Sequence, residues 1–136
     1  MTQLRYLVLL AEAAGHFGQG AEGLRLLAEA WVTLEESKQG QLLAEAQRVQ
    51  GELLLRQAVP NESQAEACFQ QALAIARRQQ AKSWELRAAL SLSRLWQQQG
   101  KRQEASDLLA PIYDWFTEGF DTADLQDARA LLEALS

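Results

Sequence analysis

Apolar side chains recur every three or four residues along most of the chain, which is the spacing that places them on one face of an α-helix. The clearest case is a pair of segments separated by Gly100. One apolar stripe precedes this glycine and one follows it: Ala89, Leu92, Ser93 and Trp96, then Ala105, Leu109 and Ile112. The pattern predicts a helix, a tight turn and a second helix that faces back onto the first. The small side chain of Ala105 lets the two backbones approach closely.

The same periodicity predicts helices over most of the remaining chain. Their ranges are about 2–14, 21–37, 41–58, 62–80, 83–98, 102–117 and 123–135. Pro60 ends one helix, and Asn61 is a favourable N-cap for the next, with Gln64 three residues later. Ser83 is the predicted N-cap of the following helix. Pro111 lies within a predicted helix, where the missing N–H and the ring predict a kink.

Equivalent positions repeat along the chain. Aligned on Ala30, Ala72 and Ile112, the helix pairs have a period of about 41 residues, longer than the 34 of the tetratricopeptide repeat. A helix pair of this kind cannot bury its apolar face alone and stacks on its neighbours. We therefore expect an all-α, tetratricopeptide-like α-α superhelix forming a single domain, 1–136. It comprises three helix pairs and a C-terminal capping helix: 2–37, 41–80, 83–118 and 123–135.

Composition agrees with this fold and narrows the function. Hydrophobic residues make up 48% of the 136 residues, enough for a continuous core, and strong helix formers dominate. The net charge of −5 disfavours a nucleic-acid partner, which usually requires a basic surface. The single cysteine, Cys68, excludes an internal disulfide and fits a reducing cytoplasm. No stretch approaches the roughly 20 apolar residues of a membrane span. Arg5 and the apolar run 7–10 loosely suggest a signal peptide, but the run is short and fits a first helix.

Several segments between residue 41 and the C-terminus resemble one known family. The most specific are Ser83-Trp84-Glu85-Leu86-Arg87-Ala88-Ala89-Leu90-Ser91-Leu92-Ser93-Arg94-Leu95 and the run from Phe116 to Ala128, FTEGFDTADLQDA. They resemble the C-terminal tetratricopeptide region of large bacterial signalling proteins, where it follows a class III adenylate or guanylate cyclase domain and a predicted ATPase module. The resemblance implies a non-catalytic fragment of a bacterial cytoplasmic regulator.

No constellation for catalysis or cofactor binding emerges from the sequence. His16, the only histidine, has no neighbouring nucleophile, and no Gly-rich phosphate loop is present. The carboxylates between Glu118 and Asp127 lie around a helix start, where they complement the helix dipole rather than form a metal site. Cys68 is interpreted as a buried, inert thiol. Trp96 and Trp115 are interpreted as packing residues, and Trp84 as a partly exposed anchor for a partner.

The sharper hypothesis concerns the concave face of the array, which the first helix of each pair would line. The positions projecting there are Arg5, Val8, Glu12, Arg48, Glu52, Arg87, Leu90, Arg94, Gln97 and Gln98. Four of them are arginines, whose planar guanidinium groups suit carboxylates and backbone carbonyls. We expect this groove to bind an extended or helical peptide of acidic character. The alternative is that the arginines are solvated surface groups paired with glutamates: Glu12, Glu45, Glu52 and Glu85.

The preferred function is therefore protein–protein interaction or scaffolding, without enzymatic activity, nucleic acid or membrane. The competing hypothesis is a small-molecule sensor that regulates an attached cyclase or ATPase, which an apolar pocket with converging polar groups would favour. Open ends of a helical array can stack on each other, and this allows a homodimer through the first helix.

Overall fold

The computed structural model describes residues 9, 11–13, 20–37 and 43–136, with the backbone alone described at residues 20 and 30–37. Within these ranges all regular structure is helical, so the all-α prediction is confirmed for the part of the chain described. Residues 11–13 are helical. The longer helices are α2 (Gly20–Ser37), α3 (Leu43–Leu55), α4 (Glu62–Arg78), α5 (Lys82–Gln98), α6 (Arg102–Trp115) and α7 (Ala123–Leu135). None of them has the length and apolar character needed to cross a membrane.

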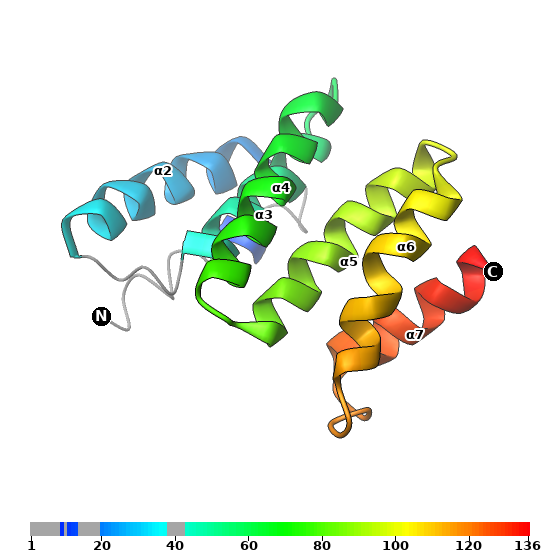
Figure 1. Cartoon of the computed structure of the whole chain (residues 1–136). Coiled ribbons are helices and arrows are strands. Elements are labelled where there is room, and N and C mark those ends of the chain that lie inside the picture. Colours follow the sequence, from blue (N-terminus) through cyan, green and yellow to red (C-terminus); the bar gives the residue numbers. More distant parts are fainter. Residues whose placement is uncertain (1–8, 10, 14–19, 38–42) are drawn as a thin grey trace.

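The helices from α3 to α7 run in alternating directions, and each packs against the next along the chain (Figure 1). Two further contacts join helices that are not neighbours in sequence: α3 contacts α5, and α5 contacts α7. These three helices therefore form one layer, which we call the α3–α5–α7 layer. Helices α4 and α6 pack against it, and α2 packs against α3.

The core repeats at nearly the period of about 41 residues that the sequence pattern predicts. Gly23, Ala65 and Ala105 are all buried, at intervals of 42 and 40 residues. Four residues after each of them comes a large side chain that is also fully buried: Leu27, Phe69 and Leu109. The same pair of small and large residues thus packs the second helix of each predicted pair.

Small residues stand where helices approach most closely. A Cβ placed on Gly51 in α3 would lie 2.5 Å from Cε1 of the buried Phe69 in α4. The hydroxyl of Ser93 in α5 donates a hydrogen bond of 3.3 Å to the carbonyl oxygen of Ala105 in α6. The close approach predicted at Ala105 is therefore confirmed, and Gly51 marks a second one.

The helix ends follow the predicted turns with some differences. The side chain of Asn61 caps α4 by accepting a hydrogen bond from the backbone N–H of Gln64, at 3.2 Å. The N-cap prediction for Ser83 is wrong, because α5 begins at Lys82 and Ala81 occupies the cap position. The N–H of Ala81 donates to the carbonyl of Ala76 at 2.9 Å, closing a Schellman-type turn that leads directly into α5.

Three helices end earlier than predicted: α3 ends at Leu55 rather than 58, α4 at Arg78 rather than 80, and α6 at Trp115 rather than 117. Phe116, which follows α6, has an extended backbone. Pro111 lies inside α6 as expected, while the kink remains a prediction.

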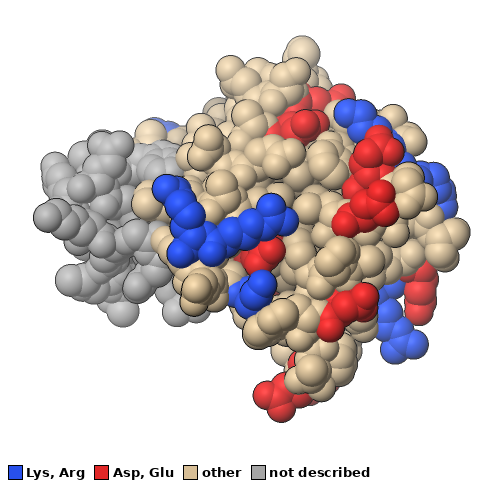
Figure 2. All heavy atoms as spheres, in the orientation of Figure 1, with Lys and Arg blue, Asp and Glu red and all other residues tan. Residues whose placement is uncertain are grey.

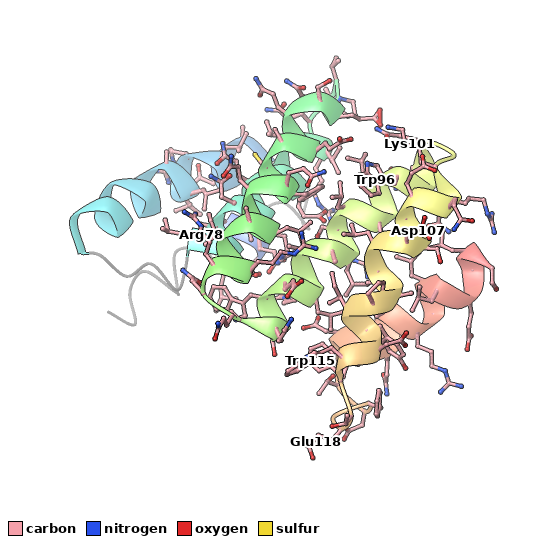
Figure 3. The ribbon with its side chains drawn as sticks, in the orientation of Figure 1. Arg78, Trp96, Lys101, Asp107, Trp115 and Glu118 are labelled. Atoms are coloured by element: carbon pink, nitrogen blue, oxygen red, sulfur yellow. The ribbon has the colours of Figure 1, made fainter. Side chains whose placement is uncertain are left out.

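Trp96 packs in the core as predicted, whereas Trp115 does not. Trp96 packs against the main core and donates its indole N–H to Glu66 at 3.2 Å, as a packing residue should. Trp84 is half-buried between α3 and α4. The packing prediction for Trp115 is wrong, because its side chain is 57% exposed at the end of α6 (Figure 3). The buried stripe of α6 continues from Ile112 to Phe116, so Trp115 lies beside this stripe rather than on it.

Candidate binding groove

The candidate site is a pocket of about 160 Å³ on the α3–α5–α7 layer, to which each of these helices contributes side chains. On α3 and α5 the contributing residues are single or adjacent positions that recur every three or four residues, and on α7 they are three apart, so one stripe of each helix faces the pocket. Its charged lining residues are Glu12, Arg48, Glu52, Arg56, Arg87, Arg94, Asp124 and Asp127. The remaining lining residues are Val49, Leu53, Leu90 and Ser91.

Many of the residues predicted for the groove lie together around this pocket. They are Glu12, Arg48, Glu52, Arg87, Leu90 and Arg94. Gln97 is half-buried and Gln98 is exposed, and neither lines the pocket. Arg5 and Val8 lie outside the described residues.

Sequence reasoning missed four polar residues of the pocket. Arg56 follows Glu52 by one helical turn, and Ser91 lies between Arg87 and Arg94 on the same face of α5. These two spacings could have identified them. Asp124 and Asp127 were attributed to the helix dipole alone, because their cross-helix partners cannot be read from local spacing.

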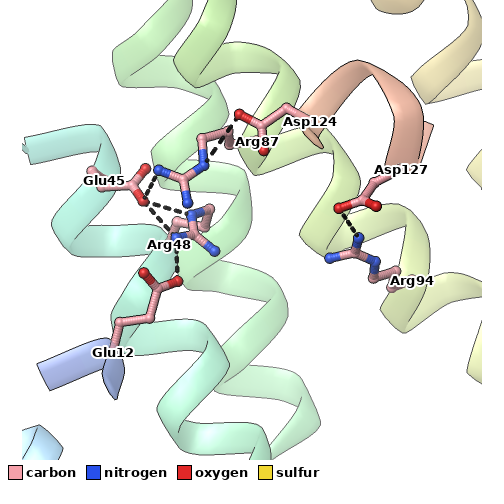
Figure 4. Close-up of polar contacts among 7 residues, drawn as sticks. All are labelled: Glu12, Glu45, Arg48, Arg87, Arg94, Asp124 and Asp127. Atoms are coloured by element: carbon pink, nitrogen blue, oxygen red, sulfur yellow. Dashed lines mark hydrogen bonds and ion pairs between the residues drawn. The ribbon is translucent and has the colours of Figure 1, made fainter. Parts of the chain in front are cut away.

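A buried ion-pair network closes one end of the pocket (Figure 4). The Arg48 side chain is 7% exposed, and its Nη2 lies 2.6 Å from Oε2 of Glu12. Its Nε donates to Oε1 of Glu45 at 3.0 Å. The same Glu45 oxygen lies 2.8 Å from Nη1 of Arg87. This network joins the helical residues 11–13 to α3 and α5.

Electrostatic forces on Arg48 oppose one another. Burial favours the neutral form and acts to lower the pKa of Arg48. The hydrogen bond to Glu45 and the negative charges of Glu45 and Glu12 outweigh burial, so the pKa of Arg48 is held above its ordinary value. Arg48 is therefore a permanently charged group that holds two carboxylates in place.

The other end of the pocket is open and loosely paired. Arg87 Nε lies 3.6 Å from Oδ2 of Asp124, and Arg94 Nη2 lies 3.5 Å from Oδ2 of Asp127 (Figure 4). Both distances exceed those of normal hydrogen bonds. Exposed pairs of this kind contribute little to stability. Among the described residues Arg94 makes no hydrogen bond, so its N–H donors are available to a ligand.

Ser91 is the unusual polar residue of the pocket. It is 2% exposed, and its hydroxyl has no hydrogen-bond partner within the described part of the chain. Buried hydroxyl groups are normally paired, because an unpaired one loses its bonds to water without replacement. Ser91 thus places an unsatisfied buried hydroxyl at the wall of the pocket.

The charges around the pocket balance. Four arginines face four carboxylates among its lining residues. The pairings that the alternative hypothesis expected are present for Glu12 and Glu45, whereas Glu85 pairs with Arg77 at 3.1 Å and with Lys82 at 3.4 Å. The arginines near Glu45 therefore have structural partners, and those at the open end retain spare donors.

A second hollow, of about 540 Å³, lies where the α4–α5 turn meets the end of α6. Lys82 Nζ lies 5.3 Å from the ring centroid of Trp115 there, within the range of a cation–π contact. Figure 2 shows acidic and basic side chains interspersed on the face that contains α4 and α6, without a large area of one sign. The buried Glu85 in its lining is already paired with Arg77 and Lys82, so none of the described residues that line this second hollow has an unpaired buried polar group.

No group of three or more histidine, cysteine, aspartate or glutamate side chains in the described residues is arranged to hold a metal ion. Searches against protein-family models, curated proteins and solved structures found no match to this chain.

Proposed function

We propose that this chain is a tetratricopeptide-like interaction module whose groove, on the α3–α5–α7 layer, binds an acidic peptide or an acidic segment of a partner protein. One observation carries the proposal. Side chains that helical spacing alone placed on a common face, from residues 12, 48, 52, 87, 90 and 94, line one pocket.

Three features of the packing support a tetratricopeptide-like superhelix. Small residues recur at equivalent buried positions, the helices alternate in direction, and the first helices of the second and third pairs share a layer with α7. Such an array leaves one face of its first helices available to a partner.

The chemistry of the open end favours an acidic ligand. Arg94 makes no hydrogen bond among the described residues, and Arg56 makes no ion pair there. Both are exposed. Arginine binds carboxylates through paired N–H donors with defined geometry. The buried network around Arg48 holds the pocket preformed, so binding needs little rearrangement.

The sequence resemblance supplies the biological setting of the proposal. In that setting the module is the sensory or scaffolding arm of a bacterial cytoplasmic signalling regulator and has no catalytic activity of its own. Homodimer formation through an open end of the array belongs to the same proposal.

A small-molecule sensor is the second candidate. The pocket volume of about 160 Å³ is close to that of an engineered cavity that accommodates benzene, about 150 Å³. A ligand of this size could fill the pocket and alter the spacing of α3, α5 and α7. The largely charged lining makes this candidate weaker, because typical small-molecule sites are mainly apolar.

The test is a fluorescence-anisotropy titration with a library of labelled acidic peptides. We expect the Arg87→Ala/Arg94→Ala double variant to lose about tenfold or more in affinity, because a charge-assisted hydrogen bond from Arg94 contributes roughly 1.5–3 kcal/mol and Arg87 holds the pocket wall in place. The control is Arg78→Ala/Arg129→Ala, which removes the same charge from exposed positions outside the pocket. Equal affinities for the two double variants would remove Arg87 and Arg94 from the binding site.

A thermal-unfolding screen with nucleotides and metabolites separates the two candidates. A compound that binds the native state raises the melting temperature. Such a rise in the absence of any peptide binding would favour the sensor.

A further inference from the structure

We propose that the open end of the pocket is a seat for one carboxylate group, bound jointly by the Arg94 guanidinium and the Ser91 hydroxyl. Without a ligand, the carboxylate of Asp127 lies beside Arg94 but does not hydrogen-bond to it. The inference rests on the proposed function and specifies what the groove recognises: the carboxylate of an aspartate or glutamate side chain in the bound peptide.

The unpaired hydroxyl of Ser91 is the first observation. Ser91 is 2% exposed, lines the pocket and has no hydrogen-bond partner in the described part of the chain. Ser91 and Arg94 are three residues apart on α5, so their side chains are neighbours on one face of the helix. The Ser91 hydroxyl oxygen is itself buried, so its side chain must turn toward the pocket to reach a ligand. An acceptor there can then receive hydrogen bonds from both residues, and a carboxylate has two oxygens for this purpose.

The state of Arg94 is the second observation. Its Nη2 lies 3.5 Å from Oδ2 of Asp127, which is an ion-pair distance but not a hydrogen bond. A carboxylate from α7 thus already lies beside Arg94 without satisfying its donors. A ligand carboxylate with freer geometry can pair with the guanidinium more closely.

Arg48 and Arg87 do not compete for this role. Two nitrogens of Arg48 are already engaged by Glu45 and Glu12, at 2.5–3.0 Å. Arg87 lies 2.8 Å from Glu45. Their donors position the walls of the pocket, whereas those of Arg94 remain free to bind.

The dimensions of the pocket set the size of the group. Its volume of about 160 Å³ accommodates a group about as large as benzene. This is enough for one carboxylate on a short stem, but not for a nucleotide. Leu90 and Leu53, which also line the pocket, provide apolar surface for the stem.

Competition with Asp127 gives the seat a distinctive response to mutation. Asp127→Asn removes the internal competitor, so affinity for the carboxylate should rise by roughly 1.5- to fivefold. Ser91→Ala and Arg94→Ala should each lower it by a similar factor or more. A residue that only maintained the fold would not raise affinity when altered.

The experiment follows the side-chain Nε–Hε NMR signal of Arg94 during titration with N-acetyl-glutamate methylamide. The neutral N-acetyl-glutamine methylamide is the matched probe. The control variant is Glu133→Gln, which removes the same charge from an exposed position of α7 outside the pocket. Circular dichroism verifies that each variant is folded.

We expect the glutamate probe alone to move the Arg94 signal, and Asp127→Asn but not Glu133→Gln to tighten binding. An Arg94 signal that does not respond to the glutamate probe, or an Asp127→Asn variant that binds no more tightly than Glu133→Gln, overturns the proposal. Acidic peptides that bind while the probe does not would reject the seat and leave the interaction function standing. A glutamate probe that binds when no acidic peptide does would support the seat and reject the interaction function.

A final arm uses free glutarate, because a small dicarboxylate shares the same chemistry. Tighter binding of glutarate than of every acidic peptide would overturn the peptide as the source of the carboxylate. Weaker binding of glutarate supports it.

Discussion

Replacing Arg48 by methionine removes the guanidinium that joins residues 11–13, α3 and α5. Glu45, whose side chain is 11% exposed, would keep Arg87 as its remaining cationic partner, at 2.8 Å. Glu12 would lose its 2.6 Å contact with Arg48. Methionine is long and unbranched and fills much of the space, so the main cost arises from unpaired charge rather than from a cavity.

The magnitude follows from this geometry. Removing one partner of a buried ion pair costs about 3–5 kcal/mol, because the other charge is left buried and uncompensated. Arg87 compensates part of the Glu45 charge, and Glu12 has partial access to solvent. We therefore expect Arg48→Met to lower the free energy of unfolding by about 2–3 kcal/mol.

Urea unfolding monitored by circular dichroism measures this loss. The matched control is Arg25→Met, because Arg25 also pairs with two glutamates, Glu22 and Glu29, but on the exposed surface of α2. It should have little effect. Adding Glu45→Gln to Arg48→Met should recover much of the loss, since a neutral amide needs no counter-charge. The reasoning fails if Arg48→Met costs no more than Arg25→Met, or if the double variant is no more stable than Arg48→Met alone.

Three further predictions test the packing at Gly51, the cap at Asn61 and the burial of Cys68. Gly51→Ala should lower the urea-derived free energy of unfolding by about 1–2 kcal/mol, because the new methyl group meets the buried Phe69 ring and helix propensity offsets only part of the strain; a gain in stability would contradict the close approach. Asn61→Ala should cost about 1 kcal/mol in the same assay, through loss of the cap on the Gln64 N–H, and an unchanged midpoint would argue against that cap. Burial raises the pKa of the Cys68 thiol, so a smaller fraction of Cys68 than of free cysteine is thiolate at neutral pH. Its alkylation by iodoacetamide should be slower than that of free cysteine and should keep rising with pH after free cysteine levels off, whereas a fast reaction at neutral pH would refute this.

Much of the fold could be predicted because helix packing is encoded in short-range spacing. The buried positions of α6, Ala105, Leu109 and Ile112, follow directly from their separations of four and three. Trp115 was assigned to the core because it lies next to core positions, but it stands one residue before the stripe position Phe116. Cys68 has the same relation to Phe69, and it is half-buried rather than fully buried.

The site could be predicted only within each helix. Arg87 and Arg94 are two turns apart on α5, so their common face is evident from the sequence. The partners of these arginines on α7, Asp124 and Asp127, depend on how far α7 is rotated and shifted against α5, and no local pattern encodes that. The same is true of the contact between Arg48 and Glu12, which lie 36 residues apart.

Photo-cross-linking tests the proposed groove most directly. An acidic peptide that carries a photoreactive group beside its carboxylate would be bound to the full chain and irradiated, and the attachment points would be identified by mass spectrometry. The account predicts attachment to the pocket-lining stripes of α3, α5 and α7. Attachment confined to α4 and α6, or none above that of a scrambled neutral peptide, would contradict it.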